Sequence, residues 1–182
     1  MDWDALYRNG QYAYIWHPRE PDEDVSAITQ FIRGKILEVG CGAGAHLSSL
    51  VKYGFDASGV DGSPTAVELT KKQGLICEKA EAETLPFADK SFSTVIDFGL
   101  LHTIDEATWP SVIKEYRRVL RDGGVLIVRG FDSSPAAVTP IDIARFIMYG
   151  FEEQHQQVIL AKLGCGDMKM LQVVLRVRGD VA

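Results

Sequence analysis

Short apolar runs alternate along this chain with longer stretches whose apolar residues recur at helical spacing. Runs of the first kind predict strands, and the amphipathic stretches between them predict helices. Because strands that alternate with helices pack as a parallel sheet covered on both faces, the pattern predicts an α/β fold. The predicted strands lie near residues 35–39, 55–60, 75–78, 92–98, 124–131, 151–161 and 169–178.

The last two predicted strands depart from this alternation. Only residues 163–167 separate them, too few for a crossover helix, so the pair is predicted to form an antiparallel hairpin. Elsewhere, Ser63-Pro64 predicts an N-cap and a first helical position, and Gly74 predicts the end of that helix. Similar signals predict a helix end at 122–124, a helix start at Thr139-Pro140 and its end at Gly150.

Three glycines follow the first predicted strand. Residues 36–44 read Ile-Leu-Glu-Val-Gly-Cys-Gly-Ala-Gly, so the strand breaks at Gly40, Gly42 and Gly44, and a helix is expected to begin near His46. Glycines at a strand end allow a tight turn and let a ligand approach the backbone closely. The loop therefore predicts a ligand site at the carboxyl end of this strand.

Two acidic residues indicate the kind of ligand. Asp61 is predicted at the carboxyl tip of the second strand, where a carboxylate can accept both hydroxyls of a ribose. Glu38, two residues before the first glycine, would repel a pyrophosphate but attract an ammonium group. S-adenosylmethionine has a ribose, an ammonium group and no phosphate. The spacing Gly-x-Gly-x-Gly agrees, because dinucleotide folds use Gly-x-Gly-x-x-Gly.

In these residues the chain resembles the class I S-adenosylmethionine-dependent methyltransferases, over roughly residues 35–131. The resemblance implies a Rossmann-like, seven-stranded, mostly parallel sheet of order 3-2-1-4-5-7-6, with strand 7 antiparallel and helices on both faces. The matching blocks, in the expected order, are Ile-Leu-Glu-Val-Gly-Cys-Gly-Ala-Gly (36–44), Gly-Val-Asp-Gly-Ser-Pro (59–64), Glu-Ala-Glu-Thr-Leu-Pro-Phe-Ala-Asp-Lys-Ser-Phe (81–92), Leu-Leu-His-Thr-Ile-Asp (100–105) and Arg-Arg-Val-Leu-Arg-Asp-Gly-Gly (117–124).

The resemblance also implies a set of cofactor contacts. Glu81 and Ala82 fall where the family places an acid and a backbone amide against adenine, although the family often has aspartate there, and Glu83 is the competing acid. Phe98 could pack against the cofactor beside its methyl group. Cys41 is interpreted as a structural residue of the loop. The residues expected to bind S-adenosylmethionine and its product S-adenosylhomocysteine are Glu38, Gly40, Cys41, Gly42, Gly44, Asp61, Gly62, Glu81, Ala82 and Phe98.

Two residues near the end of the fourth strand are candidates for catalysis. Asp97 could act as a general base, with the alternative that its carboxylate caps the turn after the strand. His102, about one helical turn later, could also act as a general base. The alternative is that its side chain only packs in the wall of the pocket. The four histidines show no metal-ligand spacing, so no metal is predicted.

The composition narrows the function further. A chain of 182 residues with 46% apolar residues is most simply one domain. Its net charge of −6 and scattered basic residues disfavour a nucleic-acid partner and favour a small-molecule methyl acceptor. Three cysteines without Cys-x-x-Cys spacing fit a reducing cytoplasm, and neither a signal peptide nor a membrane span is predicted.

The first 33 residues are rich in aromatic side chains. The spacing Trp-x-x-x-Tyr-x-x-Gly loosely resembles the entry segment of thiopurine and tellurite-resistance methyltransferases. Residues 1–33 are therefore predicted to form a lid over a nucleotide-binding core of residues 34–182, with Tyr7, Tyr12 or Tyr14 over the cofactor. The alternative is that Trp3, Tyr7 and Trp16 pack on the edge of the sheet and complete the core.

The combined interpretation is an S-adenosylmethionine-dependent methyltransferase that acts on a small molecule by in-line methyl transfer. One alternative is a methyltransferase for RNA or protein, which would require a basic or extended docking face. Another is a non-catalytic cofactor-binding protein or a subunit that depends on a partner. A dehydrogenase is disfavoured by Glu38 and by the glycine spacing. The methyl acceptor, the atom methylated and the oligomeric state do not follow from the sequence.

Overall fold

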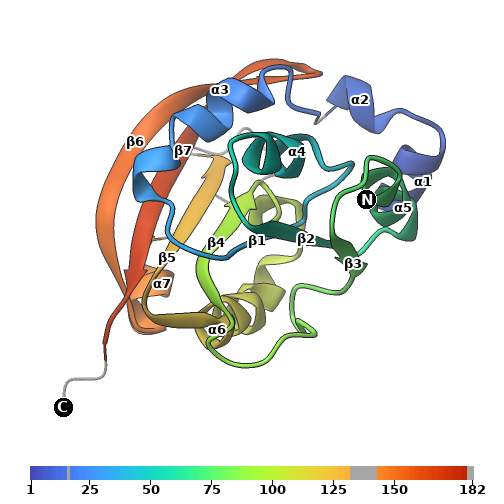
Figure 1. Ribbon diagram of the computed structural model, residues 1–182. Coiled ribbons are helices and arrows are strands. Elements are labelled where there is room, and N and C mark those ends of the chain that lie inside the picture. Colours follow the sequence, from blue (N-terminus) through green and yellow to red (C-terminus); the bar gives the residue numbers. More distant parts are fainter. Residues whose placement is uncertain (16, 132–142, 180–182) are drawn as a thin grey trace.

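A seven-stranded sheet of order β3-β2-β1-β4-β5-β7-β6 forms the centre of the computed structural model, which describes residues 1–15, 17–131 and 143–179 (Figure 1). Strands β1 to β5 are parallel, and β7 runs antiparallel to both of its neighbours, β5 and β6. This confirms the predicted strand order and the terminal hairpin. The strands are β1 (Ile36–Val39), β2 (Ala57–Asp61), β3 (Cys77–Lys79), β4 (Phe92–Phe98), β5 (Leu120–Phe131), β6 (Phe151–Leu163) and β7 (Gly166–Val177).

Helices cover both faces of the sheet (Figure 1). Helices α3 and α4 lie on one face and α6 lies on the other, while β3 and β4 are joined by a loop without a helix. The helices are α1 (Trp3–Arg8), α2 (Tyr12–Ile15), α3 (Pro21–Ser26), α4 (Ala45–Lys52), α5 (Pro64–Lys72), α6 (Trp109–Val119) and α7 (Ile143–Met148), with 3-10 turns at Thr29–Phe31, Leu101–Thr103 and Glu106–Thr108.

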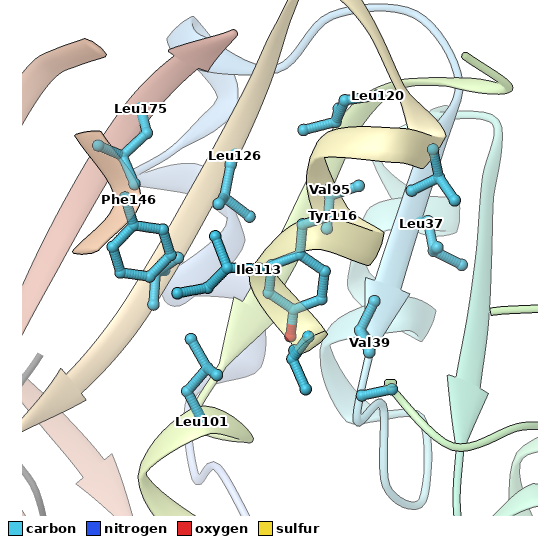
Figure 2. Packing of buried hydrophobic residues seen from close by; sticks show 14 of the residues in the cluster. Leu37, Val39, Val95, Leu101, Ile113, Tyr116, Leu120, Leu126, Phe146 and Leu175 are labelled. Carbon is cyan, nitrogen blue, oxygen red and sulfur yellow. The ribbon is translucent and has the colours of Figure 1, made fainter. Parts of the chain in front are cut away.

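Two apolar layers arise because successive side chains of a strand point to opposite faces. Leu37 and Val95 face the layer that contains α6, whereas Ile36 and Ile96 face the layer that contains α3 and α4. Figure 2 shows the first layer, where Ile113 and Tyr116 of α6 lie among strand side chains. Full burial of one such side chain contributes about 1.5–3 kcal/mol, so these two layers hold the helices on the sheet.

Most predicted boundaries agree with the structure to within a few residues. The Ser63 hydroxyl accepts a hydrogen bond from the Ala66 amide at 3.1 Å, which confirms the predicted N-cap of α5, and Gly74 follows that helix with a φ of 78°. Helix α7 ends just before Gly150, as predicted. The predicted helix start at Thr139-Pro140 lies outside the described residues.

The predicted helix end at 122–124 is wrong. Helix α6 already ends at Val119, and Leu120 is extended and pairs with Phe92 of β4. The next pair joins Thr94 to Val125, so the intervening residues of β5 form an irregularity in the strand. Leu120 is fully buried, and its packing in the α6 layer outweighs the local signal of the two glycines.

The N-terminal segment (residues 1–33) crosses the carboxyl edge of the sheet and is attached to the rest of the protein near Asp4 and near Pro18. At one end, the Asp4 carboxylate accepts hydrogen bonds from the Ser63 hydroxyl at 2.6 Å and from the Thr65 amide at 3.0 Å. Figure 1 shows α1 beside α5 accordingly. At the other end, Pro18 pairs with Leu163 at the tip of the β6–β7 hairpin. No helix within the described ranges is long and apolar enough to cross a membrane.

Candidate functional site

A cavity of about 370 Å³ lies where the carboxyl ends of the parallel strands meet the N-terminal segment. This is the edge at which open α/β sheets bind ligands. Nine of the ten predicted cofactor-binding residues line it: Glu38, Gly40, Cys41, Gly42, Asp61, Gly62, Glu81, Ala82 and Phe98.

The tenth, Gly44, does not line the cavity. It is the N-cap of α4 with a φ of 81°, and a Cβ there would lie 2.9 Å from Thr70. Gly42 does line the cavity, and a Cβ at that position would lie 2.5 Å from the hydroxyl oxygen of Tyr7. The loop therefore needs glycine for two reasons: Gly44 lets the helix start close to α5, and Gly42 lets Tyr7 approach the loop.

Cys41 lies within this loop, but its sulfur atom packs beneath the loop. The Sγ atoms of Cys41 and Cys77 are 3.4 Å apart, and both side chains are buried against Val67 of α5. This packing agrees with the structural interpretation of Cys41.

Asp61 stands at the end of β2 and already accepts two backbone hydrogen bonds. Its Oδ2 accepts from the Gly42 amide at 2.8 Å, and its Oδ1 accepts from the Ser63 amide at 2.9 Å. Each carboxylate oxygen has a second lone pair, so both oxygens can still accept a hydroxyl. Burial raises the pKa of Asp61 above its usual value despite the two amides, and Glu38 and Glu81 add to that effect.

Glu38 is almost fully buried, and one of its oxygens lacks a donor. Its Oε1 lies 3.6 Å from Nδ1 of His46, whereas Oε2 is buried without a hydrogen-bond partner among the described residues. An unsatisfied buried oxygen is costly, about 1–3 kcal/mol or more. A ligand with an ammonium group would satisfy it, so this orphaned atom fits the tail of S-adenosylmethionine.

His46 connects Glu38 to a second carboxylate. Its Nε2 lies 3.1 Å from Oδ2 of Asp24, a residue of α3. Burial acts to lower the pKa of the imidazole, but the hydrogen bonds to Asp24 and Glu38 more than offset this and hold the pKa above its usual value. The protonated imidazole is thus the form that this site favours.

Arg129 completes this buried chain. Its guanidinium donates to Oδ1 of Asp24 at 2.6 Å and to Oε1 of Gln172 at 2.8 Å, and it lies 3.9 Å from the centre of the Phe98 ring. The sequence analysis did not identify Asp24 or Arg129 as site residues. The one available signal was a charged residue at position 129 inside an otherwise apolar strand.

The structure places Asp97, the first candidate base, in the turn after β4. Its Oδ1 accepts from the amides of Gly99 and Leu100 at 3.0 and 2.7 Å, and its Oδ2 accepts from the Tyr116 hydroxyl at 2.8 Å. The side chain is fully buried, faces α6 and does not line the cavity. The geometry matches the alternative, a carboxylate that caps the turn after β4.

His102, the second candidate base, does not line the cavity either. It is buried in the 3-10 turn after β4, and burial lowers its pKa to about 4. The imidazole is therefore neutral near pH 7 and belongs to the packing of this turn.

The sheet order, the glycine turn after β1 and the acid after β2 define a class I S-adenosylmethionine-dependent methyltransferase. Residues 37–128, half of the chain, match the family model described as a methyltransferase domain, and the chain belongs to this family.

Two curated relatives illustrate the range of the family. The phthiotriol/phenolphthiotriol dimycocerosates methyltransferase of Mycobacterium leprae is 38% identical over 98 residues, which cover 50% of this chain and 36% of that protein. The ubiquinone biosynthesis O-methyltransferase of Cereibacter sphaeroides is 27% identical over 123 residues, which cover 64% of this chain and 49% of that protein. The chain thus spans about a third to a half of the length of these relatives.

A solved structure agrees with the fold over nearly the whole chain. It is a protein described in connection with the conversion of a disulfide bond into a thioacetal group during echinomycin biosynthesis. The TM-score is 0.79 at 21% identity, with 98% of this chain and 92% of that one covered. At this identity the likeness establishes the fold alone.

We expect Asp97→Asn to change how the free energy of unfolding depends on pH. Burial raises the pKa of Asp97 from 3.8 to about 6, so the unfolded chain loses this proton first. Wild-type stability should therefore fall as the pH rises between those values, by about 1.4 kcal/mol per unit of pKa difference, or about 3 kcal/mol in all. Relative to the wild type, the variant should become more stable across that window in urea unfolding.

The control for this measurement is Asp56→Asn, at an exposed residue just before β2. The stability differences of the two variants from the wild type are compared over the same pH range. A pH-independent difference for Asp97→Asn would contradict the buried capping role.

Proposed function

We propose that the protein transfers the methyl group of S-adenosylmethionine to a small molecule by in-line displacement. The observation that carries this proposal is the cavity itself, which extends from the glycine loop to the β6–β7 hairpin under the N-terminal segment. A partly covered cavity of this kind can hold a cofactor and a small acceptor together, whereas a large polymer would need an extended docking face.

Each end of the cofactor has residues suited to it in this proposal. Asp61 accepts the ribose hydroxyls, and Glu38 pairs with the ammonium group through its unsatisfied oxygen. Glu81 and the amide of Ala82 lie at the adenine end, and Phe98 lies beside the methyl group. Bound S-adenosylmethionine supplies a methyl group on a sulfonium, which is already a strong electrophile. The protein mainly aligns the reactants and excludes water.

Charge and relatives both favour a small acceptor over RNA or protein. The net charge of −6 opposes binding to a polyanion. One of the two curated relatives is named for ubiquinone biosynthesis and the other for phthiotriol and phenolphthiotriol dimycocerosates. Neither name refers to a nucleic acid or a protein as the methyl acceptor.

A methyl-transfer screen tests the proposed function. The protein would be incubated with S-adenosylmethionine and small thiols, phenols, amines and carboxylates, and release of S-adenosylhomocysteine would be measured. Release that depends on one of these acceptors supports the proposal. Cofactor binding without any release would favour a non-catalytic or partner-dependent protein, and transfer only to RNA or protein would favour the polymer alternative.

Substitution of Asp61 tests the placement of the cofactor. Asp61→Ala removes a charged acceptor for two hydroxyls, and hydrogen bonds to charged groups contribute about 1.5–3 kcal/mol. The affinity for S-adenosylhomocysteine measured by calorimetry should fall roughly 10- to 100-fold. Asp56→Ala, at the opposite end of β2, should bind normally. Equal affinities for both variants would show that Asp61 only organises the loop through Gly42 and Ser63.

We also propose that residues 1–33 form a cap over a core of residues 34–182 within one domain. Trp3, Tyr7 and Tyr12 line the cavity, which supports the cap, whereas Tyr14 is 78% exposed and does not line it. Trp16 lies outside the described residues. Among the three tyrosines considered from the sequence, Tyr7 and Tyr12 are therefore the ones placed to cover a cofactor.

Hydrogen exchange can separate a mobile cap from a fixed wall. Because ligand contacts would order a mobile cap, exchange across residues 3–20 should slow when S-adenosylhomocysteine binds. Exchange in β4, which is buried in both states, serves as the internal control. Strong and equal protection of residues 3–20 with and without ligand would make the segment a permanent part of the core.

A further inference from the structure

One histidine of the N-terminal segment lines the cavity beside the β6–β7 hairpin. His17 lines the cavity, and its ring lies edge-on to Tyr12 with the ring centroids 5.7 Å apart. Its backbone is held on both sides: its amide donates to the Tyr12 carbonyl at 3.2 Å, and its carbonyl accepts from the Gly164 amide at 3.0 Å. The main chain thus fixes where this imidazole sits relative to the hairpin.

The surroundings of His17 are largely apolar. Ala161 and Leu163 of β6 and Met170 of β7 form the hairpin wall of the cavity. The charged groups at this end are compensated within the protein, because Arg129 is paired with Asp24. An acceptor bound here would therefore lie against apolar walls, with few groups able to exchange a proton with it.

His17 differs from the other histidines in its capacity to take up a proton. His46 also lines the cavity, but both of its ring nitrogens lie against carboxylates. His102 and His155 are not part of the lining, and His155 stacks on Phe31. Burial lowers the pKa of His17, and nearby His46 lowers it further, so His17 is neutral at pH 7.

The position of His17 relative to the reacting end of the cofactor follows from His46. The His46 ring lies edge-on to Phe98 at the end of β4, with centroids 4.9 Å apart, and Phe98 is the residue proposed to lie beside the methyl group. His17 and His46 line the same cavity, and the hydrogen bond from the Gly164 amide places His17 beside the hairpin. In the proposed arrangement of the cofactor, His17 therefore lies on the hairpin side of the methyl group.

We propose that His17 is the general base of the methyl transfer, and that the acceptor presents a hydroxyl or an amine on an apolar small molecule. This inference rests on the proposed function. The acceptor's lone pair forms the bond to the methyl carbon while the carbon–sulfur bond breaks and its electrons stay on sulfur. The proton of the hydroxyl or amine moves to a ring nitrogen of His17 and then to water, so atoms and charge balance.

The base must be neutral to act, so the rate should fall as the pH drops through the pKa of His17, which lies below the ordinary value of 6.5. Other titratable groups line the same cavity and belong in the interpretation of any pH profile. They are the N-terminal amine of Met1, Asp2, Asp4, Tyr7 and Tyr12 of the N-terminal segment, Asp24 of α3, Glu38 of β1, Cys41 of the glycine loop, His46 of α4, Asp61 of β2, Glu81 and Glu83 of the loop after β3, and Arg129 of β5.

The kinetic test uses the best acceptor from the methyl-transfer screen. With His17→Gln, kcat should fall at least about 100-fold and lose its decline at acid pH, while the KM for the acceptor and the affinity for S-adenosylhomocysteine stay within about twofold. Added imidazole should restore part of the kcat of His17→Ala. His155→Gln, a histidine outside the cavity, should behave as the wild type.

The outcomes separate this inference from the proposed function. A wild-type protein that methylates nothing contradicts the proposed function. A wild type that methylates phenols or amines, with His17→Gln equally fast, overturns only the role of His17. A protein that methylates carboxylates alone also overturns it, because a carboxylate needs no base.

A second measurement does not depend on turnover. Histidine ring signals in nuclear magnetic resonance would be followed in the protein loaded with S-adenosylhomocysteine, during addition of phenol as a protic probe. The His17 signals should shift and those of His155 should not, and His17→Gln should leave the signals of His102 and His155 unchanged. Unchanged His17 signals at saturating phenol would show that this imidazole does not face the acceptor, and the proposal would then be dropped.

Discussion

The ion pair between Arg129 and Asp24 joins the N-terminal region to the sheet. Arg129 is only 4% exposed and comes from β5, while Asp24 lies 105 residues earlier in α3. Attraction within a buried pair roughly offsets the cost of removing both charges from water, yet loss of one partner costs about 3–5 kcal/mol. The pair therefore determines where α3 lies more than how stable the protein is, and the shape of the cavity depends on that position.

The same carboxylate organises the floor of the cavity. Asp24 binds Arg129 through one oxygen and His46 through the other, and His46 in turn approaches Glu38 at the end of β1. The Phe98 ring is contacted by both cations, Arg129 over its face and His46 at its edge. Residues from α3, α4, β1, β4 and β5 are thus held in one arrangement by contacts that share a single acidic side chain.

The sequence predicts those parts of the fold and site that depend on local spacing. The glycine loop and Asp61 could be placed because the turn and the acid directly follow apolar runs. The spacing shows that Asp97 is near a strand end but not which face of the sheet it is on: side chains alternate, so adjacent Asp97 and Phe98 point to opposite sides of the sheet. Asp24 and Arg129 are 105 residues apart in the sequence and meet only through tertiary packing, and His17 becomes part of the same cavity lining only in the fold.

The two ends of the cavity differ in how their charges are compensated. At the cofactor end, Glu38 keeps an unsatisfied oxygen, and burial raises the pKa of Asp61, so both carboxylates favour a ligand that brings positive charge and hydroxyl donors. At the hairpin end, the Arg129–Asp24 pair is neutral overall and the remaining walls are mostly apolar. This asymmetry gives a cationic ligand one preferred direction in the cavity. It also leaves the opposite end to an uncharged molecule, beside which the imidazole of His17 is neutral at pH 7 and keeps a lone pair on one ring nitrogen.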